Sequence, residues 1–276
     1  MRIVAGMTAP TDPTESFQIP IEAAERYETA FVPGFFVQWA PILCEVAGVS
    51  EGHRVLDVAC GTGIVARTAA DLVGPAGTII GVDLNEAMLI VANRVRPDIE
   101  WRHADAVALP FPDDSFDTVL CQMALMFFED RGRAVNEMTR VVAKDGTVAV
   151  VVPSALERQA MFRPFVELAA RIVGPEAISL LTSYFVCGDL GELTRLVESA
   201  GLRVTVKRSV VGTYAAPSVD AAVTTEVEST PLAERISSAT YRQLREEAVE
   251  VLAPFTESDG GLVAPFECLV VAARRD

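Results

Sequence analysis

The sequence has few histidines and few positive charges, and it contains no long apolar run. Only two histidines occur in 276 residues, and 23 lysines and arginines stand against 38 aspartates and glutamates. Nucleic acids and anionic membranes are bound mainly through lysine and arginine, so a formal net charge of −15 argues against both as partners. No apolar stretch has the length of a membrane-spanning helix, and the first residues lack the apolar segment of a signal peptide. We therefore expect a chain that binds neither nucleic acid nor a membrane.

Cysteine is present, but in no pattern that binds metal or forms a disulfide framework. The five cysteines are odd in number, lie far apart and include no C-x-x-C pair. Scattered cysteines of this kind are typical of proteins in a reducing compartment. We expect a cytoplasmic protein without a bound metal.

Between residues 54 and 152, short apolar runs alternate with segments of helical pattern. We predict strands over residues 54–59, 78–83, 99–104, 116–122 and 146–152. Strands that alternate with helices form βαβ units, and their apolar character indicates a parallel sheet covered on both faces. After Pro153 the pattern changes to helices and loops, and strands return at 202–211 and 266–272.

These changes of pattern divide the chain into four parts. They are an amino-terminal arm with lid helices (1–45), a core (46–153), a cap insertion (154–190) and a segment that completes the sheet (191–276). Met7 is a candidate alternative start, which makes the six residues before it an extension. The polar arm is long enough to reach a neighbouring subunit, so a homo-oligomer held by this arm is one hypothesis.

The sequence VLDVACGTG places a β-branched strand directly before a glycine turn that opens a helix. Such a turn lets a ligand approach the backbone closely, with helix N–H groups pointing at it. The second strand ends at Asp83, where a carboxylate accepts hydrogen bonds from both hydroxyls of a ribose. An NAD site has these features too, but here Ala66 stands at the third glycine position of the dinucleotide fingerprint. A nucleoside without phosphates fits this shorter turn better.

Four motifs in order carry a resemblance over about residues 50–153. VLDVACGTG resembles motif I of the class I S-adenosylmethionine (SAM)-dependent methyltransferases, and GVDLNEAML resembles their acidic loop. HADAVALPFPDDSFDTVLCQMALMFF is similar to the segment that joins their third and fourth strands, and RVVAKDGTVAVVV resembles their fifth-strand motif. The similarity is greatest to the ubiquinone/menaquinone-biosynthesis branch. The resemblance implies an α/β, Rossmann-like sheet of seven mostly parallel strands with helices on both faces, an antiparallel last strand and a helical cap. It also implies SAM as cofactor and S-adenosylhomocysteine (SAH) as product.

The resemblance assigns most of the cofactor contacts residue by residue. Gly61 and Gly63 are expected to pack against the methionine half of SAM. Asp83 is expected to bind the ribose hydroxyls, while Leu84 and Met88 enclose the adenine.

The remaining assignments lie on the third and fourth strands and on the first turn. Asp105 is expected to accept a hydrogen bond from the adenine amino group, and the Ala106 N–H to face a ring nitrogen. Gln122 is expected to line the methionine end. Ala59 also contacts the cofactor in this assignment, but the family often has glycine there, so the extra methyl group is expected to shift the cofactor slightly.

The two histidines are poorly placed for catalysis. His53 precedes the first strand, at the end of the sheet away from ligands, and His103 lies two residues before Asp105. A non-catalytic role is favoured for both, which disfavours an O-methyltransferase driven by a histidine base. An aspartate, glutamate or tyrosine base remains an open alternative.

Aromatic residues are concentrated where the lid and cap are expected. One interpretation is an apolar cluster that holds the amino-terminal helix on the core. The other is a chamber around the sulfonium group, since ring faces favour positive charge. Tyr27 is the leading candidate for positioning the reactants, because its hydroxyl is within reach of the SAM carboxylate or the acceptor. The predicted acceptor pocket consists of Tyr27, Phe31, Phe35, Phe36, Phe127, Phe162, Phe165, Tyr184 and Phe185.

An aromatic pocket with few bases favours a small apolar acceptor and methylation at carbon. The whole chain is similar to the teleocidin-type prenyl C-methyltransferases of indole-alkaloid biosynthesis. That resemblance implies methylation of a geranyl double bond in terpenoid secondary metabolism, followed by cation-driven ring closure onto the indole. A quinone-ring C-methyltransferase and an O- or N-methyltransferase of a secondary metabolite are alternatives within the enzymes. A SAM-binding scaffold without catalysis is the alternative from another class.

Overall fold

A seven-stranded sheet forms the centre of the part that the computed structural model describes, residues 18–174, 179, 181–228 and 232–276. The predicted arm up to residue 17 lies outside the described residues. The strands are β1 (Arg54–Val58), β2 (Thr78–Asp83), β3 (Glu100–His103), β4 (Phe116–Gln122), β5 (Val142–Pro153), β6 (Leu202–Ala216) and β7 (Leu262–Arg275).

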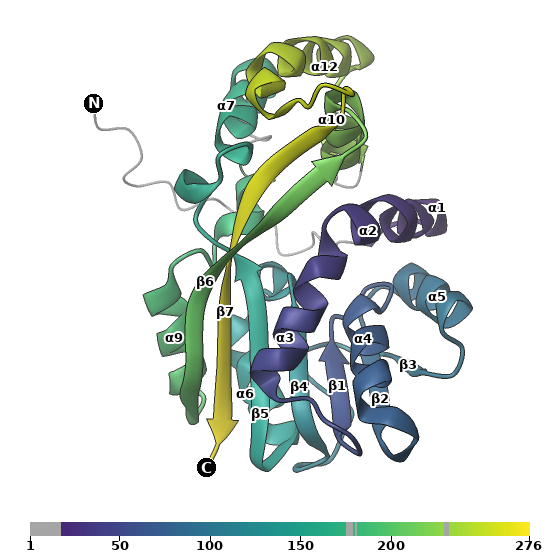
Figure 1. Ribbon diagram of the computed structural model, residues 1–276, viewed down its shortest axis with the longest axis vertical. Helices are drawn as coiled ribbons and strands as arrows, with labels where there is room; N and C mark the ends of the chain where they lie inside the picture. Colours follow the sequence, from purple (N-terminus) through teal and green to yellow (C-terminus); the bar gives the residue numbers. More distant parts are fainter. Residues whose placement is uncertain (1–17, 175–178, 180, 229–231) are drawn as a thin grey trace.

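The strand order is β3-β2-β1-β4-β5-β7-β6. Strands β1 to β5 pair in parallel, and β7 runs antiparallel to both β5 and β6. The predicted α/β fold with an antiparallel last strand is confirmed. Figure 1 shows the strand ends of this sheet facing a separate helical layer at the top.

Helices cover both faces of the sheet, as expected for apolar parallel strands. α3 (Trp39–Ala47) and α4 (Ile64–Val73) pack on one face, and α6 (Arg131–Val141) and α9 (Leu190–Ser199) on the other. Successive residues of β4 alternate between the two clusters: Leu120 packs with α3 and α4, whereas its neighbours Val119 and Cys121 pack on the other side. α5 (Glu86–Val95) lies against β2 and β3.

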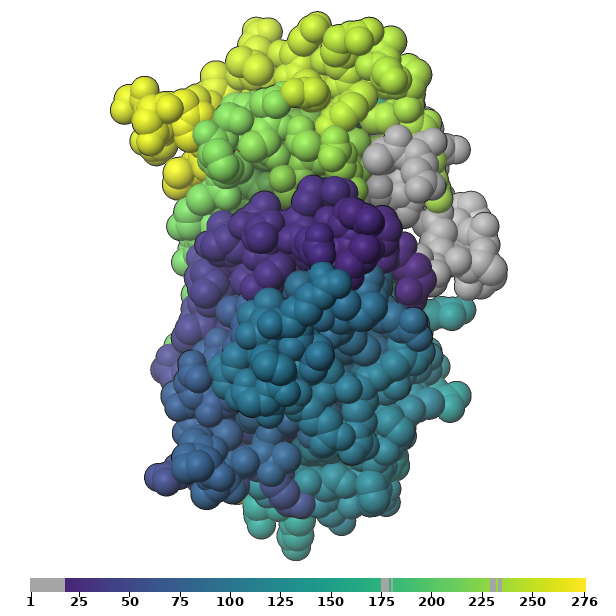
Figure 2. Space-filling view, turned by 90° about the vertical axis from the view of Figure 1, so that its right-hand side faces the viewer, coloured from purple at the N-terminus to yellow at the C-terminus, as the bar shows by residue number. Residues whose placement is uncertain are grey.

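The amino-terminal segment is a broken helix. It contains α1 (Ile21–Arg26), a π-helix η1 (Tyr27–Phe31), α2 (Val32–Gly34) and η2 (Phe36–Gln38) before α3. The helix breaks directly after Pro33-Gly34, whereas Pro41 lies within the continuous helix α3. Figure 2 shows this segment lying across the molecule between the core and the cap.

No single helix among the described residues is long and apolar enough to cross a membrane. Two successive helical stretches, Ile21–Gly34 and Phe36–Ala47, together have the length and apolar composition of a membrane-spanning helix, but the chain bends by 57° between them.

Strands β6 and β7 extend beyond the rest of the sheet. β5 pairs with β7 only as far as Pro153 and Cys268, whereas β6 and β7 stay paired to Ala216 and Leu262. The predicted strands at 202–211 and 266–272 were therefore too short. Gly212 of β6 lies close to Gln38 and Trp39, and an added Cβ would come within 2.6 Å of the Trp39 ring.

The cap sits on this two-stranded ribbon. It contains α7 (Phe162–Val173), α10 (Val219–Glu228), α11 (Leu232–Arg235) and α12 (Ser238–Leu252), with α12 packed on both α7 and α10 (Figure 1). Helices from two of the predicted parts, 154–190 and 191–276, thus share the cap.

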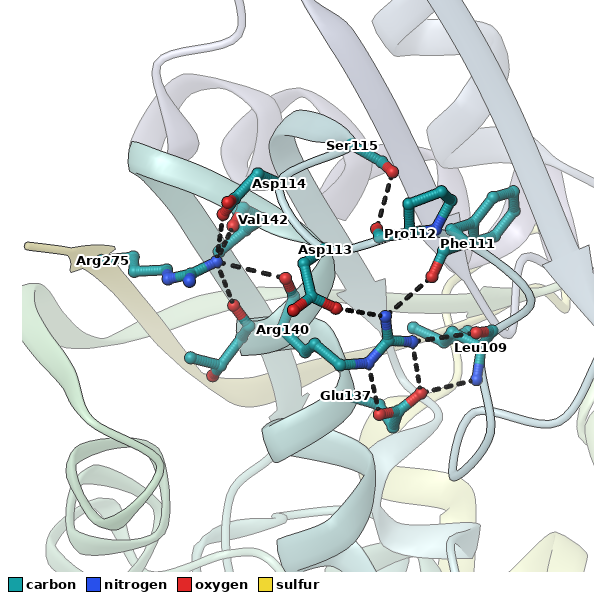
Figure 3. A network of polar contacts seen from close by, with 11 residues as sticks. Leu109, Phe111, Pro112, Asp113, Asp114, Ser115, Glu137, Arg140, Val142 and Arg275 are labelled. Carbon is teal, nitrogen blue, oxygen red and sulfur yellow. Dashed lines mark hydrogen bonds and ion pairs between the residues drawn. The ribbon is translucent and has the colours of Figure 1, made fainter.

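A polar network fixes the loop before β4. Figure 3 shows Arg140 of α6 at its centre. The guanidinium donates to the Glu137 carboxylate at 2.7 Å and to the backbone carbonyls of Leu109 (2.9 Å) and Phe111 (2.7 Å). It also pairs with Asp113 at 2.9 Å, and it holds the pKa of Glu137 below its usual range. One side chain therefore ties the loop to the helix.

We expect Arg140→Met to lower the free energy of unfolding by about 1–3 kcal/mol, because two carbonyls and two carboxylates lose their donor. The matched control is Arg203→Met, since within the described residues Arg203 pairs with exposed Asp276 at the sheet edge. This substitution is expected to lower the free energy of unfolding by about 0–1 kcal/mol. Urea unfolding of both variants checks this, and equal losses contradict it.

Candidate functional site

A cavity of about 530 Å³ lies between the carboxyl ends of the strands and the cap. Residues at the ends of β1, β2 and β4 form its floor, and residues of β6, β7, α7 and α10 form its roof. The amino-terminal segment closes one side (Figure 2). The carboxyl ends of parallel strands are where such sheets bind ligands, and the volume suits a small-molecule site.

The turn after β1 is built around a buried carboxylate. Asp57, 1% exposed, accepts a hydrogen bond from the Ala66 N–H at 2.9 Å and so caps α4 from within the sheet. Burial raises the pKa of Asp57 to about 8. The turn then passes through positive φ at Ala59 (55°) and Gly61 (54°). The φ at Ala59 costs about 1–2 kcal/mol for a residue with a Cβ, a local strain of the kind found at binding sites.

Gly63 packs closely against an aromatic ring. It has φ 89° and precedes α4, and it is not among the residues that line the cavity. A Cβ at Gly63 would overlap the ring of Trp101, which packs against the turn from β3. The expected contact of Gly63 with the methionine half of SAM stays a prediction.

We expect Gly63→Ala to lower the free energy of unfolding by about 2–5 kcal/mol, since the energy of a positive φ in alanine and the energy of the overlap with Trp101 both contribute. Gly260→Ala is the matched control, because Gly260 has φ 88° and no atom within 4 Å of an added Cβ. Its cost is expected to be only about 1–2 kcal/mol. Thermal unfolding compares the two, and a control as unstable as Gly63→Ala contradicts the overlap.

Asp83 organises the end of β2. Its carboxylate accepts from the Gly61 N–H at 2.7 Å and from the Asn85 N–H at 2.8 Å. Asn85 in turn caps α5 by accepting from the backbone of Ala87 and Met88. Burial raises the pKa of Asp83, although the two backbone donors oppose the shift. The carboxylate is thereby held at the cavity wall, beside the glycine turn.

The other predicted cofactor residues gather around the same end of the cavity. Ala59, Gly61, Asp83, Leu84, Met88, Asp105, Ala106 and Gln122 all line it, and Gly63 is the exception. Leu84 is 45% exposed, which is high for a leucine of a folded core. Their individual roles toward a ligand stay predictions.

Tyr27 connects the amino-terminal segment to the glycine turn. Its hydroxyl lies 3.6 Å from the position of a Cβ on Gly61, and its ring contacts Phe36 with centroids 4.9 Å apart. The next residue, Glu28, pairs with Arg67 of α4 at 3.0 Å, which fastens η1 over the turn. Burial and the nearby Asp83 raise the pKa of Tyr27, so its hydroxyl stays protonated.

The predicted acceptor pocket is largely brought together. Eight of its nine residues line the cavity: Tyr27, Phe31, Phe35, Phe36, Phe127, Phe162, Tyr184 and Phe185. Phe165 does not line the cavity; it is 1% exposed and packs in the hydrophobic core. Phe127 and Tyr184 meet edge to face at 5.6 Å, joining the end of β4 to the cap.

The structure adds cavity residues that the sequence reasoning missed. Tyr214 lies on β6 beyond the predicted strand end, Phe266 is the first residue of the predicted strand 266–272, and Glu226 comes from α10. A signal for Glu226 was present, since it shares helical spacing with the buried residues Val219, Ala222 and Val223. A charged residue on an otherwise apolar helix face is a sequence signal for a buried polar group of this kind.

Neither histidine lines the cavity. His53 lies at the amino end of β1 within hydrogen-bonding distance of Ser50 and Thr118, and His103 lies beside the Leu84 carbonyl. Both positions agree with the non-catalytic roles expected.

Comparison with known proteins places the chain in a family. Residues 56–150 match the methyltransferase domain family. The ubiquinone/menaquinone biosynthesis C-methyltransferase of Ectopseudomonas oleovorans is 40% identical over 114 residues, which cover 39% of this chain and 67% of the relative. The chain spans about half the length of other curated relatives that it matches, such as 48% of the enzyme of the same name from Saccharophagus degradans.

Solved structures support the fold. A SAM-dependent methyltransferase from Aquifex aeolicus aligns with a TM-score of 0.53 and 16% identity, covering 94% of this chain and all of that one. The [4+2]-cyclase SpnF aligns with a TM-score of 0.54 and 18% identity, covering 87% of this chain and 81% of that one.

The chain belongs to the SAM-dependent methyltransferases of class I. Within them it falls in the branch of the ubiquinone/menaquinone-biosynthesis C-methyltransferases, and its cofactor is SAM, as the motifs implied.

The residues present fit this cofactor. Asp83 offers a carboxylate for ribose hydroxyls, and Gly61 leaves its backbone open beneath the Tyr27 hydroxyl. Gln122 donates to the Phe36 carbonyl at 3.2 Å, while its Oε1 is buried without a hydrogen-bond partner within the described residues. Such an oxygen is suited to accept from a ligand group such as the ammonium of SAM.

Proposed function

We propose that the chain transfers the methyl group of SAM to a carbon atom of a small apolar acceptor, a prenylated indole natural product. The observation that carries the proposal is the cavity itself, in which the cofactor residues continue directly into a chamber of aromatic rings. Among the lining residues of the described part there is no lysine, arginine or histidine. The chamber therefore suits an apolar acceptor and favours positive charge.

The chain's own residues supply alignment and a suitable environment. SAM, when bound, supplies an electrophilic methyl group on a positively charged sulfur. Transfer of this kind depends mainly on holding the reactants in line. An alkene that takes the methyl group carries positive charge on carbon, which ring faces such as those of Tyr27 and Phe36 stabilise while water is kept out. That environment leaves time for ring closure onto an adjacent indole.

The sequence resemblance to the teleocidin-pathway prenyl C-methyltransferase supports a geranyl chain as the site of methylation. The fold likeness to a [4+2]-cyclase is an analogy only, since proteins that share a fold carry out different reactions.

The test is to incubate the protein with methyl-labelled SAM and a geranylated indole alkaloid and to analyse the product by mass spectrometry and NMR. We expect one labelled methyl group on a carbon of the geranyl chain and a new ring. Label on oxygen or nitrogen, or SAM binding without transfer to any acceptor offered, contradicts the proposal. The last result supports the scaffold alternative.

A quinone-ring acceptor is the second candidate, because the curated relatives are named for ubiquinone and menaquinone biosynthesis. Demethylated quinones offered in the same assay decide between the two. Faster transfer to the quinone ring than to the geranyl chain favours this candidate.

A further inference from the structure

The cap end of the cavity contains one carboxyl group among aromatic rings. Glu226 of α10 is 5% exposed and lines the cavity. The Tyr214 hydroxyl, from the ribbon strand β6, donates to its Oε1 at 3.1 Å. Tyr214 is itself 3% exposed and packs edge to face on Phe162 at 5.4 Å. The pair is thus held by two elements of the cap and faces the acceptor chamber.

Packing alone does not account for this glutamate. It lies on the buried face of α10 with Val219, Ala222 and Val223, where an apolar side chain of similar size would avoid the cost of removing a carboxyl group from water. Burial raises the pKa of Glu226 to about 7, and burial with the nearby Glu226 also raises the pKa of Tyr184. A buried polar group in an otherwise apolar pocket is the kind that fixes a ligand's orientation.

The pair of Glu226 and Tyr214 lines the same cavity as the predicted cofactor residues. Asp83 lies at the end of β2 in the core, Glu226 lies on α10 in the cap, and both line the same cavity. Figure 1 shows α10 in the upper layer, apart from β2. An elongated acceptor that reaches from the cofactor to Glu226 has its distal end beside this carboxyl group.

We propose that Glu226, positioned by Tyr214, accepts a hydrogen bond from an N–H or O–H group at the distal end of the acceptor and so determines which end of the apolar molecule faces the cofactor. This inference rests on the proposed function. A site built to accept from a donor disfavours an analogue that lacks it, because the buried acceptor then loses one hydrogen bond.

The experiment measures binding of two probes to the SAH-loaded protein by isothermal titration. The probes are 3-geranylindole and its N-methyl derivative, which differ only in the donor. At a pH about 1.5 units above the Glu226 pKa of about 7, where the carboxyl group is ionised, we expect the wild-type protein to bind the N–H probe about 10- to 100-fold more tightly, the range for a hydrogen bond to a charged group. Glu226→Leu is expected to bind both equally. A leucine variant that keeps the preference overturns the proposal, as does a wild-type protein that binds neither probe or both alike.

Two further variants keep the test decisive. Glu226→Gln is close in shape and is expected to reduce the preference even if the leucine variant does not fold; an unchanged preference overturns the proposal. Tyr214→Phe leaves the carboxyl group but removes the hydroxyl that positions it, and is expected to give a preference between those of wild type and Glu226→Leu. SAH affinity, expected to be unchanged in all three, shows that the cofactor end is intact.

The outcomes separate this inference from the proposed function. Loss of the preference in Glu226→Leu, with no methyl transfer to 3-geranylindole by the wild type, supports the donor site and contradicts that acceptor class. Transfer to a geranyl carbon with the same preference in wild type and Glu226→Leu supports the function and contradicts the donor site.

Discussion

Asp83→Ala is expected to weaken binding of SAM and SAH by at least about 100-fold, because hydrogen bonds from two ribose hydroxyls to a carboxylate contribute about 1.5–3 kcal/mol each. The carboxylate lies at the cavity wall and is aligned by the Gly61 and Asn85 N–H groups. Isothermal titration with SAH measures the affinity, and circular dichroism checks that the sheet is intact.

The matched control for Asp83→Ala is Asp71→Ala, which removes a carboxylate of α4 whose side chain is 78% exposed. Its SAH affinity is expected to equal that of the wild type. Asp83→Asn adds a second check, because it keeps the size and one acceptor oxygen but loses the charge, and we expect an intermediate affinity. Wild-type affinity in Asp83→Ala contradicts the ribose assignment.

Tyr27→Ala is expected to lower kcat/KM by about 100-fold, or about 2.7 kcal/mol, since it opens the cavity beside the glycine turn and removes a ring from the aromatic chamber. Tyr27→Phe keeps the ring contacts with Phe31 and Phe36 and loses only the hydroxyl. A loss of about 2- to 10-fold is expected for it, the usual effect of one neutral hydrogen bond. Methyl transfer from labelled SAM gives both values.

The two variants distinguish ring from hydroxyl. Equal losses in Tyr27→Phe and Tyr27→Ala show that the hydroxyl is the essential group, and full activity in Tyr27→Ala removes Tyr27 from the site. Tyr241→Ala is the control, because this tyrosine of α12 lies outside the cavity. Its activity is expected to match the wild type.

The cofactor end was predictable because its geometry is local. A strand, a glycine turn and a helix follow one another in the sequence, and the acidic residue at the end of the next parallel strand lies beside them by sheet topology. Gly61 and Asp83 therefore lie where the motif indicates. The close packing of Gly63 on Trp101 was not predictable, because Trp101 comes from a strand 38 positions later and nothing in the turn itself indicates that ring.

The cap was harder to predict because its residues meet only through long-range pairing. Tyr214 and Phe266 reach the cavity on strands that extend past the last partner residue of β5, and the extension depends on their pairing with each other. Phe165 was placed in the pocket by composition alone, whereas in the structure it packs in the hydrophobic core. Aromatic content predicted the character of the chamber but not which rings face it.

The ribbon of β6 and β7 has a consequence for how this protein can be altered. The chain leaves the sheet on β6, forms the cap helices α10 and α12, and returns on the neighbouring strand β7 (Figure 1). Exchange of residues 213–265 between relatives therefore requires only two adjacent junctions in a regular β-ladder. Such an exchange replaces the cavity residues Tyr214 and Glu226 and none of the predicted cofactor residues.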